Sequence, residues 1–554
     1  MVTTTDARTG PPHDAHAALS EHPAPFGSAA WLVAAARLAE PPTARSTVAV
    51  RLRLTDGGPD LDLRADLVGG LLSVRPAHGE EPGLVLRLPR QAALALLLGS
   101  GRRRVGVFGR GDVEATGNFS LLFFIDSALQ EDRAGQVGAL RAATSDAPDR
   151  PGPFVPAPDP DPGAADADRL AQARAALPRT IRELEREVGT STPGAQLYVS
   201  RGGKPLADVG LGMARPGVAM THESLPLWYC CAKPLLSVAL GRFWEERRFD
   251  PHLPLARYLP DFATGGKADI TVMQLLTHTG PVPTGADPLH GVVAGPDDER
   301  RRRAFALAVP PSRGAAATRR AAEINYSQWW AWFVLAHLIP VIDGRDYETY
   351  VEEEILRPCR MDATRVRLTG EDFDAFGERL PLIHVANLGG PPVPTWWWST
   401  REATTRCIPG VNTRGPLRDQ GRLLEMLLAG GAGPGGRVLA PETVAALTDR
   451  HRRGLHDRYG NADWGLGLRL ECRQLGTPYT SFGSHASPRA FGHDGLWTAV
   501  AFADPDADLA VAIHLNGKVE HERHRERILR LADAIYLDLG LVCASCEGEV
   551  KCRV

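Results

Sequence analysis

Apolar and polar residues alternate along the first part of the chain, in a pattern that is typical of strands with one buried face. The alternation covers residues 47–54, 61–67 and 84–88, and an acidic, glycine-rich turn follows the first stretch. Helices are expected at residues 28–38 and 91–98. Because the strands come in a row and the helices flank them, this region is predicted to be an α+β sheet with one covered face.

The rest of the chain has expected strands at both of its ends and expected helices between them. The strands are expected at residues 195–200, 206–211, 464–470, 490–493 and 498–515. The helices are expected at residues 165–188, 233–247, 272–277, 326–342, 347–356 and 521–539. This order predicts one antiparallel sheet built from both ends of the block, with a helical insert, and therefore a second α+β domain.

A proline-rich segment divides the two blocks. Seven of the fifteen residues at 148–162 are proline. Such a composition gives a stiff, extended linker that does not pack. We therefore divide the chain into a first domain at 1–143, a linker at 144–164, a second domain at 165–540 and a cysteine-containing tail at 541–554.

The overall composition argues against several kinds of partner and location. The 554 residues carry a net charge of −3, so no general attraction to nucleic acid is expected. No apolar run is long enough to predict a membrane span. The N-terminus has no secretory signal and the eight cysteines do not suggest a disulfide framework, so we expect a cytoplasmic protein. Cys543, Cys546 and Cys552 lack a fourth zinc ligand, and no cofactor is predicted.

The strongest candidate for chemistry is Cys230, which lies three residues before Lys233. At this spacing a thiol and an amine share one face of a helix. A desolvated lysine can accept the proton of a nucleophile. Pro234 is tolerated in the first turn of a helix, which places Cys230 at the helix start, where backbone amides stabilise a thiolate. Cys231 has the wrong spacing to Lys233 and is expected to point into the core.

Four motifs in the second domain resemble those of serine β-lactamases and penicillin-binding proteins. Cys230 and Lys233 resemble the Ser-x-x-Lys signature, with cysteine in place of serine. Residues 270–280 resemble the segment after the nucleophile helix in class C β-lactamases and family VIII carboxylesterases. Tyr326-Ser-Gln328 resembles Tyr-x-Asn, and His493-Asp-Gly495 resembles the Lys/His-Thr/Gly-Gly motif. The resemblance implies a β-lactamase/transpeptidase-like fold.

The resemblance also implies a role for each side chain of the motifs. Cys230 is the expected nucleophile and Lys233 its base. Tyr326 is an expected general acid or base. His493 is expected to face the pocket, where it either binds a substrate carboxylate or polarises Tyr326. His278, in the second motif, is expected to be structural.

The remaining motif positions are expected to bind substrate. The backbone amides of Cys230 and Leu496 are expected to form an oxyanion hole. Gln328 replaces the usual asparagine, which shifts substrate positioning. Gly495 permits close approach of the backbone. Asp494 replaces a small residue and adds negative charge, which puts recognition of a substrate carboxylate in doubt.

The first domain resembles the sterol-carrier-protein family. The resemblance rests on the strand after Thr47, the turn at 56–59, and the stretch from Gly111 to Asn118 that precedes an apolar segment. It implies that a lipid or an acyl chain is bound in an apolar tunnel. Two alternatives stay open, namely a small domain whose apolar residues only fill its core and a module for dimerisation.

Three interpretations of the cysteine stay open. In the first, Cys230 forms a thioester and the enzyme transfers acyl groups to amines, since thioesters favour amines over water more than oxygen esters do. In the second, the enzyme is an esterase, amidase or peptidase that acts on a small acyl, peptide or ester substrate. In the third, the protein is a non-catalytic binding protein. The retention of Lys233, Tyr326 and His493 favours an enzyme, because an inert pocket needs none of them.

Overall fold

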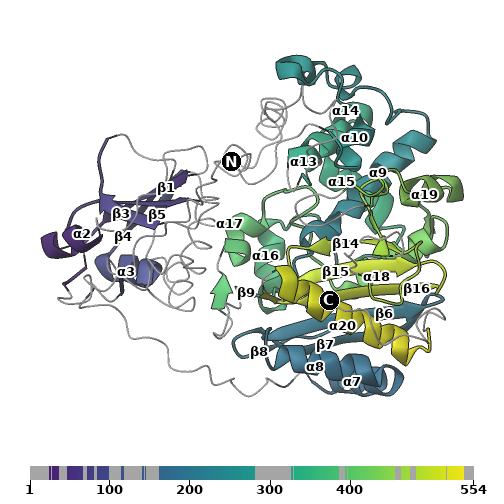
Figure 1. The fold of residues 1–554 in the computed structure, drawn as a ribbon, viewed down its shortest axis with the longest axis horizontal. Helices are drawn as coiled ribbons and strands as arrows, with labels where there is room; N and C mark the ends of the chain where they lie inside the picture. The colour runs from purple at the N-terminus through teal and green to yellow at the C-terminus, as the bar shows by residue number, and fades with distance from the viewer. Residues whose placement is uncertain are drawn as a thin grey trace, which may run out of the picture. The chain divides into compact units, whose positions relative to one another are not determined.

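The computed structural model describes most of the chain after residue 162 and shorter stretches before it (Figure 1). The described residues are 24–26, 28–35, 47–66, 72–79, 84–98, 114–117, 140–141, 144, 161, 163–280, 326–327, 330–385, 393–395, 397–455, 463–473, 482–519 and 521–541. The chain divides into two compact units. The first contains Met1–Val155, Leu289–Pro296 and Asn387–Trp398, and the second contains the remainder.

The first unit contains a five-stranded sheet in the order β3-β2-β1-β4-β5. Its elements are α2 (Ala29–Ala35), β1 (Thr47–Leu54), β2 (Leu61–Asp66), β3 (Leu72–Pro76), β4 (Leu84–Leu88), α3 (Arg90–Leu98) and β5 (Glu114–Gly117). β1 is parallel to β4 and antiparallel to β2. The three predicted strands are present, and β3 and β5 join them. Arg51 and Asp62 face each other across β1 and β2 as a buried ion pair, with 2.8 Å between Nε and Oδ1.

The second unit is built on a seven-stranded sheet in the order β13-β14-β15-β16-β6-β7-β8. The strands are β6 (Gly194–Arg201), β7 (Lys204–Arg215), β8 (Val218–Ala219), β13 (Arg469–Leu470), β14 (Phe491–Gly495), β15 (Ala499–Asp504) and β16 (Leu509–Leu515). Every neighbouring pair is antiparallel. β6 pairs with β16 from Ala195↔Leu515 to Arg201↔Leu509, so strands from both ends of the domain meet in the centre of the sheet, as predicted.

One face of this sheet is apolar and lies against three helices. Leu197, Val199, Val500, Val511 and Ile513 point to this face and are fully buried with side chains of α7 (Ala164–Ala176), α8 (Pro178–Val188) and α20 (His521–Asp538). We call it the apolar face. The single helix predicted over 165–188 is two helices, because Pro178 is the first residue of α8 and has no N–H to continue α7.

The opposite face carries polar and small side chains, and we call it the polar face. Because paired residues of antiparallel strands point to the same side, His493, Ala501, Ala512 and Tyr198 form one row across it. Gly495, Ala499, His514 and Gln196 form the next row. The helix α18 (Leu417–Leu428) packs here so closely that a Cβ on Gly421 would lie 2.2 Å from the Tyr198 ring.

Shorter elements complete the second unit. The helices are α9 (Lys233–Glu245), α10 (Val272–Leu276), α13 (Trp330–Ala336), α14 (Leu338–Ile342), α15 (Tyr347–Val351), α16 (Gly370–Phe376), α17 (Arg401–Thr404) and α19 (Pro441–Thr448). Short 3-10 segments lie at Tyr229–Ala232, Leu255–Arg257, Pro260–Gly266 and Gly377–Arg379, and a π-helical segment lies at Glu352–Leu356. The short strands are β9 (Ile383–Val385), β11 (Ala432–Gly433), β12 (Gly436–Arg437) and β17 (Gly517–Lys518). A further short strand, β10, covers Val393–Thr395 of the first unit.

Two of the predicted elements are shorter than expected. The helix predicted over 326–342 begins at Trp330 and is interrupted at His337, because Pro340 cannot donate a hydrogen bond to the carbonyl four residues earlier. The strand predicted over 464–470 contains only Arg469–Leu470, and Gly467 before it has a φ of 72°. None of the helices in the described part of the chain is long and apolar enough to cross a membrane.

Candidate active site

Cys230 lies in a turn that leads into α9. The turn Tyr229–Ala232 is a single turn of 3-10 helix, and the backbone N–H of Lys233 donates to the Cys230 carbonyl. Tyr229, which begins the turn, has a φ of 48°, in the region that non-glycine residues rarely adopt. α9 starts at Lys233, as predicted, with Pro234 in its first turn, and Cys230 lies in the turn before the helix. The Cys230 side chain is half-buried, so it remains accessible to a substrate.

Lys233 is fully buried beside this thiol. Its Nζ donates to the Gly410 carbonyl at 3.2 Å and lies 5.2 Å from the centre of the Trp332 ring and 5.7 Å from that of Tyr326. Burial lowers the pKa of Lys233, while a hydrogen bond and a charge interaction with Cys230 act in the opposite direction. A lysine whose pKa is lowered is a better proton acceptor near neutral pH, which suits the role of base.

The backbone at Gly410 is shaped to fit the lysine. Gly410 has a φ of 69°, and a Cβ there would lie 2.8 Å from Cγ of Lys233 and 3.5 Å from the Trp332 ring. A side chain at this position would displace both groups. Gly410 was not predicted as a site residue. The Pro409-Gly410 dipeptide is a turn signal, but nothing in it points to a lysine 177 positions away.

Tyr326 and His493 form the second half of the site. The Tyr326 hydroxyl lies 3.4 Å from Nε2 of His493, and Nδ1 of His493 lies 2.8 Å from the Asp494 carbonyl. Burial, followed by the charge of Lys233, lowers the pKa of His493 well below its usual value, so the ring is neutral. Because a carbonyl only accepts, Nδ1 carries the proton and Nε2 accepts from the Tyr326 O–H. A neutral histidine supports polarisation of Tyr326 rather than binding of a carboxylate.

His278 holds Tyr326 from behind. His278 follows α10, at whose start Thr271 and Gln274 form a capping box. The φ of His278 is 56°. The Ser327 N–H donates to Nδ1 of the fully buried His278 at 3.2 Å, and the ring lies 4.6 Å from that of Tyr326. Burial lowers its pKa well below the usual value. Its contacts agree with the expected structural role.

Trp464 closes the aromatic surroundings of these groups. Its ring centre lies 5.7 Å from that of Tyr326, 5.5 Å from His493 and 4.6 Å from His278. Trp464 and Trp332 contribute to the burial of this region, and burial lowers the pKa of Lys233 and of His493. The sequence offered no signal for Trp464, which lies outside the four motifs.

The end of β14 passes directly beside the turn Tyr229–Ala232 that contains Cys230. A Cβ on Gly495 would lie 2.6 Å from the Trp228 carbonyl and 3.3 Å from Cβ of Tyr229. The thiol of Cys231 donates to the His493 carbonyl at 3.1 Å and is buried, so this side chain points inward as predicted. Burial raises the pKa of Cys231 well above its usual value, which makes it a poor nucleophile.

Asp494 requires a correction. It pairs with Val500 and so shares a row with Ile513 and Leu197 on the apolar face, opposite to His493. There its carboxylate forms an ion pair with Arg469. The expected negative charge is therefore compensated and does not face the pocket. Gln328, another expected substrate-binding residue, lies outside the described residues, as do the linker apart from residues 144, 161 and 163–164, and the tail after residue 541.

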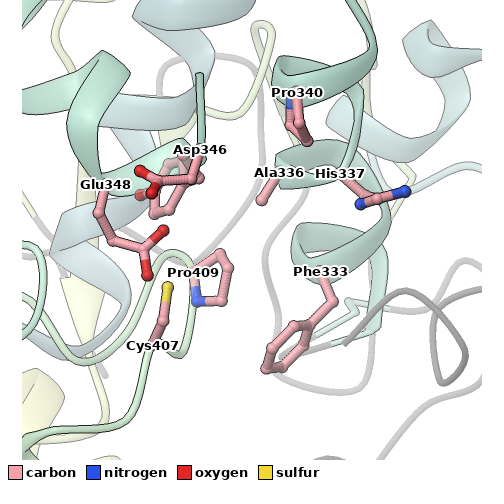
Figure 2. Close-up of a pocket in the computed structure, with 9 residues that line it drawn as sticks. Phe333, Ala336, His337, Pro340, Asp346, Glu348, Cys407 and Pro409 are labelled. Carbon is pink, nitrogen blue, oxygen red and sulfur yellow. The ribbon is translucent and has the colours of Figure 1, made fainter. Parts of the chain in front are cut away.

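A small pocket lies near the lysine but is separate from the site. Figure 2 shows Phe333, Ala336, His337 and Pro340 on one side of it. The other side is formed by Asp346, Tyr347, Glu348, Cys407 and Pro409. Its volume of about 20 Å³ has room for a single water molecule. The pocket is too small for a substrate, but it borders the Cys407–Gly410 segment that carries the acceptor for Lys233.

The fold and the site together define a class of protein. A half-buried cysteine, a buried lysine one turn later, and a tyrosine whose hydroxyl faces a histidine of β14 form an arrangement that is compatible with acyl-enzyme chemistry. The chain belongs to the Beta-lactamase family, whose profile matches residues 142–535.

Several relatives of this chain carry the names of hydrolases. A putative D-alanyl-D-alanine carboxypeptidase of Escherichia coli O157:H7 is 23% identical over 374 residues, which are 60% of this chain and 81% of the relative. Esterase/beta-lactamase LipL of Mycobacterium tuberculosis is 24% identical over 58% of this chain and 76% of its own. The solved structure of EstCE1 is 19% identical with a TM-score of 0.53, covering 68% of this chain and 100% of that one, which shows the fold.

Proposed function

We propose that Cys230 forms an acyl thioester and that the protein transfers the acyl group to an amine. The observation that carries the proposal is the contact of the half-buried Cys230 thiol with a fully buried Lys233 of lowered pKa. A neutral amine beside a thiol provides the activated nucleophile that this chemistry requires. The aromatic surroundings of Trp332 and Trp464 keep water from the base.

The acylation step uses groups from five residues. Lys233 takes the proton of the Cys230 thiol, and the sulfur attacks the carbonyl carbon of the donor. The backbone amides of Cys230 and Leu496 stabilise the oxyanion. The tetrahedral intermediate collapses with cleavage of the bond to the leaving group, which takes the Tyr326 proton. The lysine ammonium then returns its proton to the tyrosine, and His493 keeps the phenol oriented.

The second step regenerates the thiol. An amine attacks the thioester carbonyl and loses a proton to Lys233. The C–S bond breaks, an amide is released, and Lys233 returns the proton to the Cys230 thiolate. We favour an amine over water because a thioester discriminates between them more strongly than an oxygen ester does. The name of one fold relative, EstCE1, describes a hydrolase with promiscuous acyltransferase activity.

Hydrolysis is the second candidate function. It is favoured by the names of the relatives, which include carboxypeptidases and an esterase. In this case the substrate is a small ester, amide or peptide and water takes the place of the amine. We also propose that the first unit is a sterol-carrier-like domain that binds a lipid or an acyl chain. We further propose that the protein is located in the cytoplasm.

The nucleophile is tested by covalent trapping. The full-length protein is treated with iodoacetamide or an activated acyl ester, and the label is mapped by mass spectrometry. We expect Cys230 to be labelled in preference to Cys231, and the label to be lost in Cys230→Ala but kept in Cys231→Ala. Equal labelling of both thiols would contradict an enzymatic role. Product analysis with and without an added primary amine then separates acyl transfer from hydrolysis.

A further inference from the structure

The turn that follows β14 is strained. Leu496 and Trp497 have φ values of 32° and 59°, and both are non-glycine residues in a region that such residues rarely adopt. Consecutive strain of this kind persists only where surrounding contacts hold the backbone. The turn contains the Leu496 amide, which the proposed function assigns to the oxyanion hole. The question is therefore which groups hold it.

Two residues hold the turn from its ends. Thr498 donates to the Gly495 carbonyl through both its backbone N–H, at 2.8 Å, and its hydroxyl, at 2.9 Å. Arg527 of α20 donates from Nη2 to the Trp497 carbonyl at 2.7 Å. The first contact closes the turn on itself. The second ties the turn to a helix that otherwise covers the apolar face, so it fixes the turn relative to the whole sheet.

Arg527 makes this contact from a fully buried position. Its guanidinium also donates to the Gly517 carbonyl at 2.8 Å, to the Ser191 hydroxyl at 3.2 Å and to Nδ1 of His524 at 3.3 Å. Burial lowers the pKa of Arg527 to about 9. A buried guanidinium is retained where its planar set of donors serves several fixed acceptors at once, and lysine cannot reproduce that geometry.

We propose that Arg527 is a positioning residue for the oxyanion hole. It holds the Trp497 carbonyl and thereby keeps the preceding amide of Leu496 directed at the place where charge develops on the substrate oxygen. This inference rests on the proposed function of Cys230. It assigns a role to α20, a helix with no residue in the four motifs, and it predicts that a change on that helix affects one chemical step selectively.

The test compares two reactions of Cys230 in the full-length protein. Alkylation by iodoacetamide displaces iodide from a saturated carbon and forms no oxyanion, whereas acylation by a p-nitrophenyl ester does. In Arg527→Lys and Arg527→Gln we expect alkylation within about twofold of wild type. Acylation is expected to be slower by about 10- to 1,000-fold, because complete loss of one oxyanion donor slows such a step by about 100- to 1,000-fold. Ser191→Ala, which removes a contact on the other side of the guanidinium, is expected to leave the ratio of the two rates unchanged.

Each outcome decides the inference. Equal loss of both rates in the Arg527 variants, or no loss of either, overturns it, because a purely structural role does not separate the two reactions. If the Arg527 variants do not fold, Thr498→Val weakens the same turn without changing α20 and is expected to slow acylation selectively. An unchanged acylation rate in that variant overturns the inference. A wild-type protein in which Cys230 is neither alkylated nor acylated would instead refute the proposed function.

Discussion

The two faces of the seven-stranded sheet carry different kinds of side chain, although the same strands form both. On the apolar face, Leu197 and Ile513 pack with side chains of three helices and carry no polar atoms. On the polar face, one residue away along the same strands, Gln196 and His514 are equally buried. Burial lowers the pKa of His514 to about 3, so this ring is neutral in the fold. The alternation of a strand thus separates the residues that stabilise the domain from those that carry its chemistry.

The difference between the two faces indicates which side chains stabilise the domain independently of pH. Burial of an apolar side chain stabilises the fold at every pH, whereas burial of an ionisable group opposes folding whenever the group would be charged in water. Lys233 and His493, which the proposed function uses, have lowered pKa values for this reason. Activity and stability are therefore expected to respond to different substitutions.

The largest effect is expected at the nucleophile. Cys230→Ala removes the reacting atom, and acylation should fall by at least about 1,000-fold, as for other enzymes that lose a nucleophile. The side chain is only half-buried, so thermal unfolding should change little. Steady-state kinetics and differential scanning calorimetry check the two parts. Retention of activity in this variant would place the chemistry elsewhere.

The next-largest effect on activity is expected at Lys233, the proposed base. Its effect on the free energy of unfolding is expected to depend on pH. Lys233→Met removes the proton acceptor and should slow acylation by about 100- to 10,000-fold. Because the folded-state pKa of Lys233 lies below the ordinary 10.5, the unfolded chain binds more protons between the two values, and wild-type stability should rise with pH in that window. Denaturant unfolding across pH should show that the rise is smaller in the variant.

Two controls sharpen this result. Lys204→Met, at the exposed first residue of β7, should change neither the rate nor the pH dependence of stability. In wild type, the rising limb of the acylation rate with pH should have its midpoint below 10.5, because the free base is the active form. A midpoint at or above 10.5 would show that Lys233 is not desolvated.

A matched pair of neighbours on β6 compares the faces directly. Leu197→Ala on the apolar face should lower the free energy of unfolding by about 2–5 kcal/mol at every pH. Tyr198→Phe on the polar face removes the hydroxyl that donates to Glu425 at 2.8 Å and should lower it by about 1 kcal/mol. Chemical denaturation at two pH values measures both. A larger effect at Tyr198 would mean that the polar face contributes more to stability than its composition suggests.

The last effect is confined to a narrow pH range and is expected at Asp419 on α18. Burial raises the pKa of this carboxyl from 3.8 to about 6, despite a hydrogen bond from Thr364 and the charge of Arg422. The folded state therefore binds more protons than the unfolded state between these values, and stability should fall as the pH rises through this range. Asp419→Asn should flatten this fall, which corresponds to about 1–3 kcal/mol. An unchanged pH profile of unfolding would show that Asp419 does not titrate in this range.

Much of the fold could be predicted because a strand or helix with one buried face has regularly spaced apolar residues in its sequence. β6, β14, β15, β16 and α20 lie close to their predicted positions. The two predicted helices that the structure divides contain Pro178 and Pro340, and proline would have located both breaks. The short strand β3 was missed because five residues ending in proline give a weak strand signal.

The site was only partly predictable. Short motifs located Cys230, Lys233, Tyr326 and His493, because each is recognisable within a few residues. The contacts of Lys233 with Gly410 and Trp332 depend on packing between segments far apart in the sequence and have no local signal. Asp494 was placed on the wrong face, although the period-two alternation of a strand already puts it opposite to His493.

The central pairing of β6 with β16 also sets the order of events during synthesis. Ala195 and Leu515 are partners 320 positions apart, so β6 emerges from the ribosome long before the strand it pairs with. At about 5–20 residues per second this interval lasts roughly 16–64 s. Throughout it, the edge of β6 is an unpaired template for other strands. The edge of β6 therefore has to stay protected from other strands until β16 has left the ribosome.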